Sequence, residues 1–428
     1  MWLPLYYFLI SLAGLFFWPF WQYRSLKRAQ GAWARLRLGF TSQHLDKLPS
    51  GGIWVHALSV GEVRTALSVV KALVRRYAHL PLYFSVATYG GYKMARDELA
   101  KDGVHILVRP LDVPWAVKRW ITALKPCCFC LVESDMWPAW QRALKNAGVL
   151  SVLLNARISP RTFKKYVKCP GAARLLYRDF DLICVQSGLD KERLQAIGIP
   201  DAQALGNIKF DSLPRPLDEE ERRELAHELG LSGRKVFIAG STHPAARGNE
   251  AGEEEICLQV WQRLKERGFN DLVLVLAPRD VRRGEQVAAM TTDGWPVSRG
   301  ALPAGHSLLV LDVIGKLARA YGLAEVAYVG GSLVAQGGHN PLEASIQGVA
   351  ALYGPHMEDF AQMAAALNES GGGMTIFDEN DLYEKCLYFL SHPDKARAHG
   401  RMAREFCISH QGALQRVMDV LPELEKNA

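Results

Sequence analysis

The sequence of 428 residues lacks the compositional signs of several protein classes. Its charged fraction of 22% and apolar fraction of 49% are near those of an average globular chain, which excludes a disordered tail protein, a collagen and a simple coiled coil. The formal net charge of +7 is too small an excess to indicate nucleic acid as a partner. Because the chain is longer than one hydrophobic core usually organises, two domains are the default expectation.

Cysteine is also scarce, with eight residues in the whole chain. That number does not form a disulfide framework in a chain of this length, so a reducing compartment is expected. Cys127 and Cys130 form a C-x-x-C pattern, but they lie in an apolar run and no second pair completes a zinc site. We therefore expect buried structural thiols rather than a redox or metal site.

The first 23 residues contain no charged side chain, and Leu5–Trp18 is almost wholly apolar. No positive charge precedes this run, as a cleaved signal peptide would require. Basic residues follow it from Arg24 to Arg37, an order that predicts a membrane anchor with its carboxyl end in the cytoplasm. A buried core helix is the alternative. Residues 24–45 are expected to lie at the membrane interface.

The rest of the chain alternates short apolar runs with amphipathic stretches, which is typical of βαβ units and mostly parallel sheets. The expected strands are Gly52–Leu58, Leu82–Thr88, His105–Val108, Phe129–Glu133, Ser151–Asn155, Leu182–Gln186, Lys235–Gly240, Leu272–Ala277, Ser307–Leu311, Val326–Val329 and Ala350–Tyr353. Two prolines followed by an acidic run indicate a linker that leads into a helix. The expected division is 1–23, 24–45, a first domain 46–211, a linker 212–222 and a second domain 223–428, whose last helix can pack back on the first.

Two turns of the first half carry acidic residues after a predicted strand. Glu62 follows the first strand at the start of a helix, where it is either a general base or a first-turn residue that the helix dipole favours. A helix amino terminus lowers the pKa of a carboxyl group, whereas a general base benefits from a raised pKa. For Glu62 to act as a base, burial would therefore have to raise its pKa by more than the helix lowers it. Glu133 and Asp135 follow a later strand and would share a face in extended chain. Asp135 is expected to cap a helix that starts near Pro138.

Two turns of the second half contain small residues after a predicted strand. Ser241 and Thr242 follow one strand, and their backbone amides could hold a phosphate if a helix starts there, although the pattern is not a Walker loop. Two glycine pairs follow another strand and lead into Gly338, His339 and Asn340. Asn340, Pro341 and Glu343 fit a helix-capping pattern, but capping does not explain His339 or the four glycines. A nucleotide site is therefore favoured.

Lys209 and Arg279 each lie at the end of a segment that leads toward the expected cleft. Two cations on opposite walls suit a substrate that bears a phosphate or a carboxylate. Taken singly, each is more often a solvated surface charge.

Seven ordered motifs resemble those of the transferases of 3-deoxy-D-manno-octulosonic acid (Kdo), a family that moves Kdo from CMP-Kdo to the lipid A precursor. The motifs are His-Ala-Leu-Ser-Val-Gly-Glu at 56–62, Glu-Ser-Asp-Met-Trp-Pro at 133–138, Asn-Ala-Arg-Ile-Ser at 155–159, Gly-Asn-Ile-Lys-Phe-Asp at 206–211, Ala-Gly-Ser-Thr-His at 239–243, Ala-Pro-Arg at 277–279 and Val-Gly-Gly-Ser-Leu with Gly-Gly-His-Asn-Pro-Leu-Glu at 329–343. The resemblance runs through nearly the whole chain.

The resemblance implies the GT-B fold class, an α/β arrangement of two Rossmann-like doubly wound domains that face a cleft, with an amino-terminal membrane-anchor helix. It implies inverting transfer of Kdo to the glucosamine disaccharide of the lipid A precursor, in lipopolysaccharide core biosynthesis. The acceptor half comes first and the CMP-binding half second. The implied setting is the inner membrane with both catalytic domains in the cytoplasm. No metal, other cofactor, nucleic acid or obligate protein partner is expected.

Residue roles carry over to the matching positions of this sequence. Glu62 is implied as the catalytic base and Glu133 as a second acidic residue of the site. The residues implied in donor binding are Lys209, Ser241, Thr242, Arg279, Gly338, His339, Asn340 and Glu343. Those expected on the acceptor side are Ser59, Arg64 and Asp135.

This sequence departs from the family pattern at three places. The usual Glu-x-Glu before Trp-Pro reads Glu-Ser-Asp here, which shortens the second carboxylate at Asp135 by one methylene. The expected threonine-rich turn reads Ala-Thr-Tyr-Gly-Gly-Tyr at 87–92, and residues 244–251 form an insertion. The first two departures bear on the acceptor side, and the third is expected to lengthen a loop at the cleft.

Two other functions stay open at this point. One is a GT-B enzyme that uses a UDP-sugar, such as a peptidoglycan-type glycosyltransferase or a sugar-nucleotide epimerase. The apolar amino terminus argues against an epimerase, and a comparison of CMP with UDP binding separates these enzymes from a Kdo transferase. The other is a membrane-anchored binding protein without activity, against which Glu62, Lys209 and Arg279 argue.

Overall fold

The computed structural model describes residues 6–7, 10, 12, 45–245 and 251–425. These residues form two compact units. The first comprises the described residues up to Ser212 together with those from Gln411 onward, and the second comprises Leu213–His410. The first unit ends within one residue of the expected 211, and the second begins at 213 rather than at 223. The carboxyl-terminal segment packs with the first unit, as the sequence allowed for the last helix.

The first unit contains a seven-stranded parallel sheet in the order β3-β2-β1-β4-β5-β6-β7. Its strands are β1 (Ile53–Ala57), β2 (Leu82–Val86), β3 (His105–Val108), β4 (Cys128–Val132), β5 (Leu150–Ala156), β6 (Leu182–Val185) and β7 (Ala202–Ala204). Its helices are η1 (Leu45–Lys47), α4 (Val60–Arg76), α5 (Tyr89–Leu99), η2 (Ala100–Asp102), α6 (Pro114–Leu124), α7 (Pro138–Asn146), α8 (Pro160–Lys168), α9 (Pro170–Tyr177), α10 (Gly188–Ala196), η3 (Ile208–Phe210) and α19 (Ala413–Val420).

The second unit repeats this architecture with the strand order β10-β11-β9-β8-β12-β13-β14, again parallel. Its strands are β8 (Val236–Thr242), β9 (Val273–Pro278), β10 (Gly294–Pro296), β11 (Leu308–Val310), β12 (Val326–Val329), β13 (Ala351–Tyr353) and β14 (Gly373–Thr375). Its helices are α11 (Glu219–Leu229), α12 (Glu253–Glu266), η4 (Val281–Arg283), α13 (Gly284–Ala288), η5 (Val297–Arg299), α14 (Leu317–Ala320), η6 (Tyr321–Leu323), α15 (Leu342–Ile346), α16 (Ala361–Glu369), α17 (Glu379–Ser391) and α18 (Pro393–Ser409).

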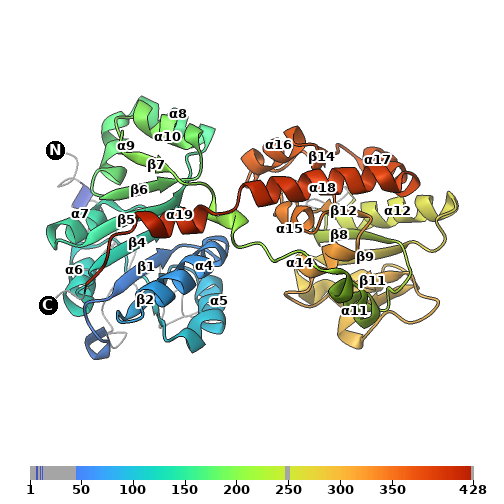
Figure 1. Ribbon diagram of the computed structural model, residues 1–428, viewed down its shortest axis with the longest axis horizontal. Coiled ribbons are helices and arrows are strands. Elements are labelled where there is room, and N and C mark those ends of the chain that lie inside the picture. Colours follow the sequence, from blue (N-terminus) through green and yellow to red (C-terminus); the bar gives the residue numbers. More distant parts are fainter. Residues whose placement is uncertain (1–5, 8–9, 11, 13–44, 246–250, 426–428) are drawn as a thin grey trace. The chain divides into compact units, whose positions relative to one another are not determined.

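Helices cover both faces of each sheet (Figure 1). In the first unit, α4, α5 and α19 pack on one face, and α6, α7, α9 and α10 pack on the other. In the second unit, α11, α15, α16 and α18 cover one face, and α12, α13 and α17 cover the other. The strands are buried on both sides, as near-continuous apolar runs predict for parallel sheets. The two doubly wound α/β units expected from the sequence are thus confirmed.

The carboxyl-terminal helix α19 lies against α4 in the first unit (Figure 1). Asp211 accepts hydrogen bonds from the amides of Gly412 and Leu414, at 2.6 and 2.9 Å, and so fixes the start of this segment. Ala413 and Val417 join the apolar core beneath α4. This packing explains why the last residues of the chain leave the second unit.

Several local expectations can be compared with the structure. The linker ends earlier than 222, because α11 starts at Glu219, with Asp218 and Glu221 forming a capping box. Cys127, Cys128 and Cys130 are buried, unpaired thiols at the start of β4 and within it, which confirms a structural role. The β strands β7, β10 and β14 were not predicted, since each has three residues at or near a sheet edge.

The predicted anchor, 1–23, and interfacial segment, 24–45, lie almost wholly outside the described residues. Within the anchor, Tyr6 is described, and its hydroxyl donates a hydrogen bond to Asp112 Oδ2 at 2.5 Å. Among the described residues, no helix combines the length and the apolar character that a bilayer crossing needs.

Candidate active site

In each unit the candidate site residues gather at the carboxyl ends of the strands, where the strand order reverses. In the first sheet, β2 lies on one side of β1 and β4 on the other, so the chain switches direction between β1 and β4. Glu62 follows β1, and Glu133 follows β4. In the second sheet, the same switch falls between β8 and β12. Open parallel sheets bind their ligands at such switch points.

Glu62 is a buried carboxylate in the first turn of α4, with 7% of its surface exposed. Its Oε2 accepts hydrogen bonds from the amides of Leu58 and Ser59, at 2.5 and 3.3 Å, and Ser59 in turn caps the helix. The hydroxyl of Ser134 donates to Oε1. Burial raises the pKa of Glu62, and the nearby Glu133 adds to this effect, although the hydrogen bonds oppose it. Burial therefore prevails over the helix amino terminus, and the raised pKa suits a general base.

Glu133 lies at the centre of a polar cluster beside Glu62. Its backbone has φ of 62°, a left-handed conformation that is uncommon outside glycine and turns the side chain away from the strand direction. Its Oε1 accepts hydrogen bonds from Thr65 Oγ1 and Asn155 Nδ2, at 3.1 and 3.2 Å. Lys209 Nζ lies 3.0 Å from Oε1 and 3.2 Å from Oε2. The predicted residues Glu62, Glu133 and Lys209 are thus brought together in the first unit.

Two asparagines that sequence reasoning missed hold this cluster in place. Asn155, which has φ of 55°, donates to both Glu133 and Asn207 Oδ1. Its own Oδ1 accepts from the amide of Ile208 at 2.9 Å, and Asn207 Oδ1 accepts from the amide of Lys209 at 3.0 Å. Both asparagines lie in motifs of the family resemblance, which was the signal available in the sequence. They fix the backbone at Ile208 and Lys209 beside the end of β5.

Asp135 does not cap α7, and it does not share a face with Glu133. Its φ of 74° turns its side chain toward His56 Nε2 at 2.9 Å, Arg109 Nε at 3.3 Å and Trp137 Nε1 at 2.6 Å. Burial acts to raise the pKa of Asp135, but His56 and Arg109 lower it to about 2. Burial lowers the pKa of His56 despite Asp135, and the other ring nitrogen, Nδ1, lies 2.8 Å from the carbonyl oxygen of Ser85.

A different carboxylate caps α7. Asp112, buried in the loop after β3, accepts hydrogen bonds from the amides of Ala139 and Trp140, at 3.2 and 2.7 Å. Burial raises the pKa of Asp112 to about 7. The helix begins at Pro138 as the sequence predicts, but its cap comes from a residue 26 positions earlier in the chain.

The other expected acceptor-side residues lie on α4. Ser59 is its N-cap, and its hydroxyl accepts a hydrogen bond from the Glu62 amide at 3.5 Å. Arg64 is exposed in the first turns of the same helix. Both therefore lie close in sequence to Glu62, but the structure gives them no more specific role.

In the second unit, Ser241 and Thr242 end β8 at the switch point. Ser241 has a left-handed backbone with φ of 57°, and Thr242 is buried and donates to Glu254 Oε1 at 3.1 Å. The following helix, α12, begins only at Glu253, so the turn does not open directly into a helix as expected for a phosphate loop. The predicted insertion, 244–251, lies mostly outside the described residues.

Glu253, which sequence reasoning missed, organises the glycine-rich loop after β12. This fully buried carboxylate accepts hydrogen bonds through Oε1 from Tyr328 Oη at 2.6 Å and from the amides of Ser332 and Leu333, both at 3.0 Å. Through Oε2 it accepts from the amides of Gly331 and His243, at 2.7 and 3.0 Å. The amides of the loop Gly331–Leu333 therefore bind a carboxylate of the protein itself and are not available to a substrate phosphate.

His243 and His339 meet between this loop and the end of β8. Their Nε2 atoms lie 2.8 Å apart and their rings are stacked, so one ring donates and the other accepts. Burial lowers the pKa of His339 to about 4, and the positive charge of Arg279 adds to this effect. Arg279 itself is exposed at the end of β9, which places a cation near His339.

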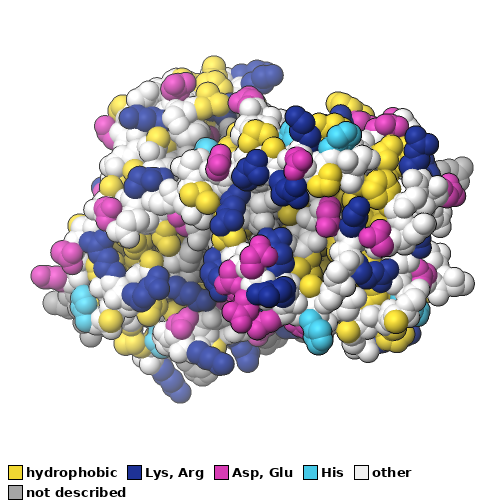
Figure 2. All heavy atoms as spheres, turned by 45° about the vertical axis from the view of Figure 1, so that its right-hand side comes forward, with side chains coloured by type: hydrophobic (Ala, Val, Ile, Leu, Met, Phe, Trp, Pro, Cys, Tyr) yellow, Lys and Arg dark blue, Asp and Glu magenta, His cyan; other side chains and the backbone are white. Residues whose placement is uncertain are grey.

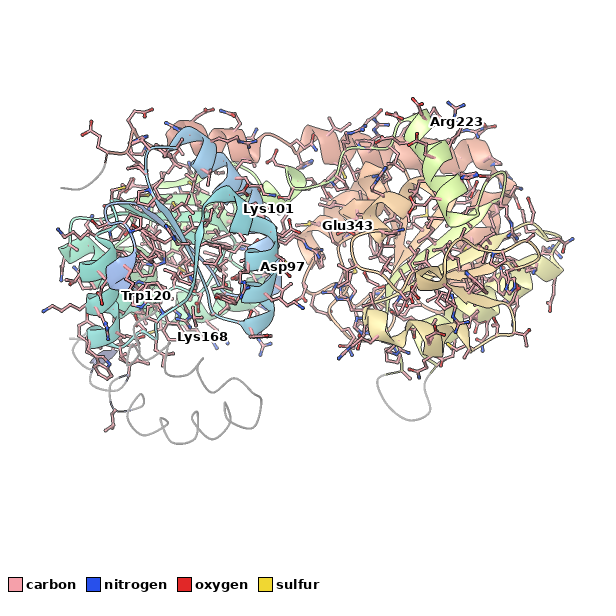
Figure 3. All side chains as sticks on the ribbon, turned by 90° about the horizontal axis from the view of Figure 1, so that it is seen from below. Asp97, Lys101, Trp120, Lys168, Arg223 and Glu343 are labelled. Atoms are coloured by element: carbon pink, nitrogen blue, oxygen red, sulfur yellow. The ribbon has the colours of Figure 1, made fainter. Side chains whose placement is uncertain are left out.

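The remaining predicted donor residues lie in the loop after β12 and in the first turn of α15. Gly338 has φ of 76°, and a Cβ there would lie 2.4 Å from Met357 Sδ, so only glycine fits. Asn340 Oδ1 accepts from the amide of Leu342 at 3.2 Å, but the N-cap of α15 is Pro341, one residue later than the sequence predicted. Glu343 is half-buried in the first turn of α15 (Figure 3). All the residues predicted to bind the donor thus lie in the second unit, except Lys209, which lies in the first.

Comparisons with known proteins identify the family of this chain. The family described as 3-deoxy-D-manno-octulosonic-acid transferase (kdotransferase) matches residues 32–212. A 3-deoxy-D-manno-octulosonic acid transferase of Haemophilus influenzae is 31% identical over 89% of this chain and 88% of its own length. The enzyme of the same name from Rickettsia felis is 28% identical over 92% of this chain and 85% of its length.

Among solved structures, a putative UDP-N-acetylglucosamine 2-epimerase from Listeria monocytogenes superposes with a TM-score of 0.57 at 13% identity, covering 89% of this chain and 100% of that one. At this identity the likeness concerns the two-unit fold alone. The sequence relatives extend over both units. The chain belongs to the family of 3-deoxy-D-manno-octulosonic acid transferases.

Proposed function

We propose that this chain transfers Kdo from CMP-Kdo to the glucosamine disaccharide of the lipid A precursor, with inversion and with Glu62 as the general base. Family membership supports the reaction. The observation that carries the role of Glu62 is its buried carboxyl group of raised pKa at the switch point of the first sheet. A base of raised pKa binds the acceptor proton more strongly in the transition state.

In this mechanism Glu62 removes the proton from an acceptor hydroxyl as the oxygen attacks the anomeric carbon of Kdo. The bond between that carbon and the phosphate oxygen breaks, and CMP leaves with the electron pair. Lys209 holds Glu133 in place and so keeps a second carboxylate beside the base, which helps to maintain the raised pKa of Glu62.

The donor is proposed to bind in the second unit, at the carboxyl ends of β8 and β12. Arg279 is the exposed cation suited to the phosphate or the sugar carboxylate. Asn340 and Glu343 are proposed to contact the ribose, while Ser241, Thr242, Gly338 and His339 shape the pocket around the phosphate. Since Glu253 already binds the amides after β12, the charge on the leaving phosphate falls to side chains, with Arg279 in the place of a metal ion.

The proposed setting is the inner membrane, with residues 1–23 as an anchor, residues 24–45 at the headgroups and both units on the cytoplasmic side. No metal, other cofactor, nucleic acid or obligate protein partner enters the proposal. The UDP-sugar alternative has lost its support, because the sequence relatives that cover both units are Kdo transferases and the epimerase likeness is one of fold.

The test is incubation of the purified full chain with CMP-Kdo and a tetraacylated lipid A precursor, followed by mass analysis of the lipid. The expected product is heavier by one or more Kdo residues, with release of an equal amount of CMP. UDP-N-acetylglucosamine in place of CMP-Kdo should give no product. Transfer from the UDP-sugar, or hydrolysis of CMP-Kdo without a lipid product, would contradict the proposal.

A further inference from the structure

A stretch of the first unit, residues 157–178, contains seven basic residues and no acidic residue. This stretch of 22 residues carries as much net charge as the whole chain, which is +7. Apart from the basic segment 24–45, the charges elsewhere are mixed, and on the face shown in Figure 2 lysine and arginine side chains lie among aspartate and glutamate side chains. An isolated basic segment of this density differs from an ordinary solvated surface.

Four of these cations form one face of helix α8, which we call the α8 basic face: Arg161, Lys164, Lys165 and Lys168. Their spacing of i, i+3, i+4 and i+7 places them on a single side of the helix. All four are exposed, and no residue of α8 is fully buried. The opposite side packs Phe163 and Tyr166 on the first unit's core, and Lys168 ends the helix (Figure 3).

The fold does not explain this face. Among the described residues, the ion pairs of this region join Arg178 to Asp179 and Arg193 to Asp190, and none includes the four cations of α8. The helix dipole favours Lys165 and Lys168 near the carboxyl end but disfavours Arg161 in the first turn. Like charges at these spacings also repel one another. The helix therefore keeps an unfavourable concentration of positive charge that no acidic side chain of the described residues neutralises. This points to an anionic binding partner outside the protein.

The position of α8 relates it to the candidate active site of the same unit. The helix follows β5 directly, and Ser159 caps it three residues after the end of that strand. Asn155, near the end of β5, donates to Glu133 in the polar cluster beside Glu62. The α8 basic face therefore begins at the edge of the sheet where a lipid acceptor must reach the proposed base.

We propose that the α8 basic face binds the anionic headgroups of the bilayer that holds the acceptor. This inference rests on the proposed function, because only a lipid acceptor requires that edge of the sheet to approach a membrane. Each Lys or Arg near an anionic surface favours binding by about 1 kcal/mol at most, so four act together over a flat area. Val167, which is 52% exposed beside the cations, suits the interface. A nucleic acid is disfavoured, since the aromatic side chains of α8 face inward and offer no stacking surface.

The chain offers a native probe of this contact. Cys169 directly follows α8 and is exposed, whereas the other seven cysteines are buried. A polarity-sensitive fluorophore on Cys169 of the full chain reports whether this helix reaches a bilayer, independently of how the amino terminus binds. The expected result is a blue shift with phosphatidylethanolamine vesicles that contain phosphatidylglycerol, a much smaller shift with vesicles that lack it, and reversal by salt.

Two variants distinguish membrane binding by the α8 basic face from non-specific binding by positive charge elsewhere in the first unit. Replacing Arg161, Lys164, Lys165 and Lys168 by glutamine should weaken the vesicle-dependent shift on the order of 10²-fold in lipid concentration. A matched control replaces four exposed lysines elsewhere in the first unit, Lys71, Lys93, Lys101 and Lys118, and should leave the shift nearly unchanged. Thermal unfolding verifies that both variants fold.

Three results would overturn the inference: equal shifts with neutral and anionic vesicles, equal losses in the two variants, or a shift that appears with single-stranded RNA and not with vesicles. None of these measurements requires turnover. The proposed function can therefore fail, by absence of Kdo transfer, while this contact is observed, and the reverse outcome is equally distinguishable.

Discussion

Replacement of Glu253 by glutamine is expected to destabilise the second unit and to weaken donor binding. The carboxylate accepts hydrogen bonds through both oxygens, and Oε2 alone receives the amides of Gly331 and His243 at 2.7 and 3.0 Å. A glutamine can keep its oxygen at the Oε1 position, but its amino group then faces two N–H donors. Two charge-assisted hydrogen bonds are lost, and a buried donor at Gly331 and a part-buried donor at His243 are left unpaired.

The magnitude follows from those two bonds. Hydrogen bonds to charged groups contribute roughly 1.5–3 kcal/mol each, so the free energy of unfolding should fall by about 3–5 kcal/mol. For a unit of this size, that loss lowers the melting temperature by roughly 10 °C. Both freed amides border His339, so the KM for CMP-Kdo should rise more than kcat falls.

The assays are thermal unfolding by circular dichroism and steady-state transfer at varied CMP-Kdo. The matched control is Glu255→Gln, an exposed carboxylate two residues along the first turn of α12, and it should change stability by less than about 0.5 kcal/mol. A loss below about 1 kcal/mol in Glu253→Gln would refute the reasoning, because the loop would then not depend on the buried charge.

Three further predictions concern pH, the Asp135 cluster and metal ions. Because burial raises the pKa of Glu62, kcat/KM should fall as the pH drops through that raised pKa. Ionisation of the buried carboxyl group also opposes folding, so Glu62→Gln should have a higher free energy of unfolding than wild type at pH values above that pKa. Equal free energies of unfolding at pH 8 would contradict this expectation. Asp135→Asn should lower the free energy of unfolding by about 2–4 kcal/mol at pH 7. Since the pKa of Asp135 is about 2, urea titrations should show that this difference between variant and wild type persists down to about pH 4 and disappears near pH 2. Transfer should withstand prolonged dialysis against EDTA, and recovery that depends on added Mg²⁺ would argue against the role given to Arg279.

Much of the fold could be predicted because parallel strands buried on both faces appear as continuous apolar runs. Val326–Val329 and His105–Val108 were predicted with the bounds that the structure shows. The edge strand β14, Gly373–Thr375, gave no such signal, since three residues are too few for a recognisable period. Element type was therefore predictable in the centre of each sheet and less so at its edges.

The site residues were predictable where a motif places them in a turn after a strand, as with Glu62 and His339. Their partners were not, because these come from distant parts of the chain: Asn155 to Glu133, Glu253 to the loop after β12, and Asp112 to α7. The extended geometry assumed for Glu133 and Asp135 was wrong for a related reason. Their left-handed backbones depend on tertiary contacts and leave no mark in the local sequence.

The proposed catalytic role of Glu62 can be measured most directly by separating binding from transfer in Glu62→Gln. The expected result is CMP-Kdo affinity within a factor of about two of wild type by calorimetry, with Kdo transfer to the lipid A precursor reduced by about 10²-fold or more. Glu219→Gln, which changes an exposed first-turn glutamate of α11, should retain full transfer. Transfer near the wild-type rate in Glu62→Gln would contradict the assignment of the base.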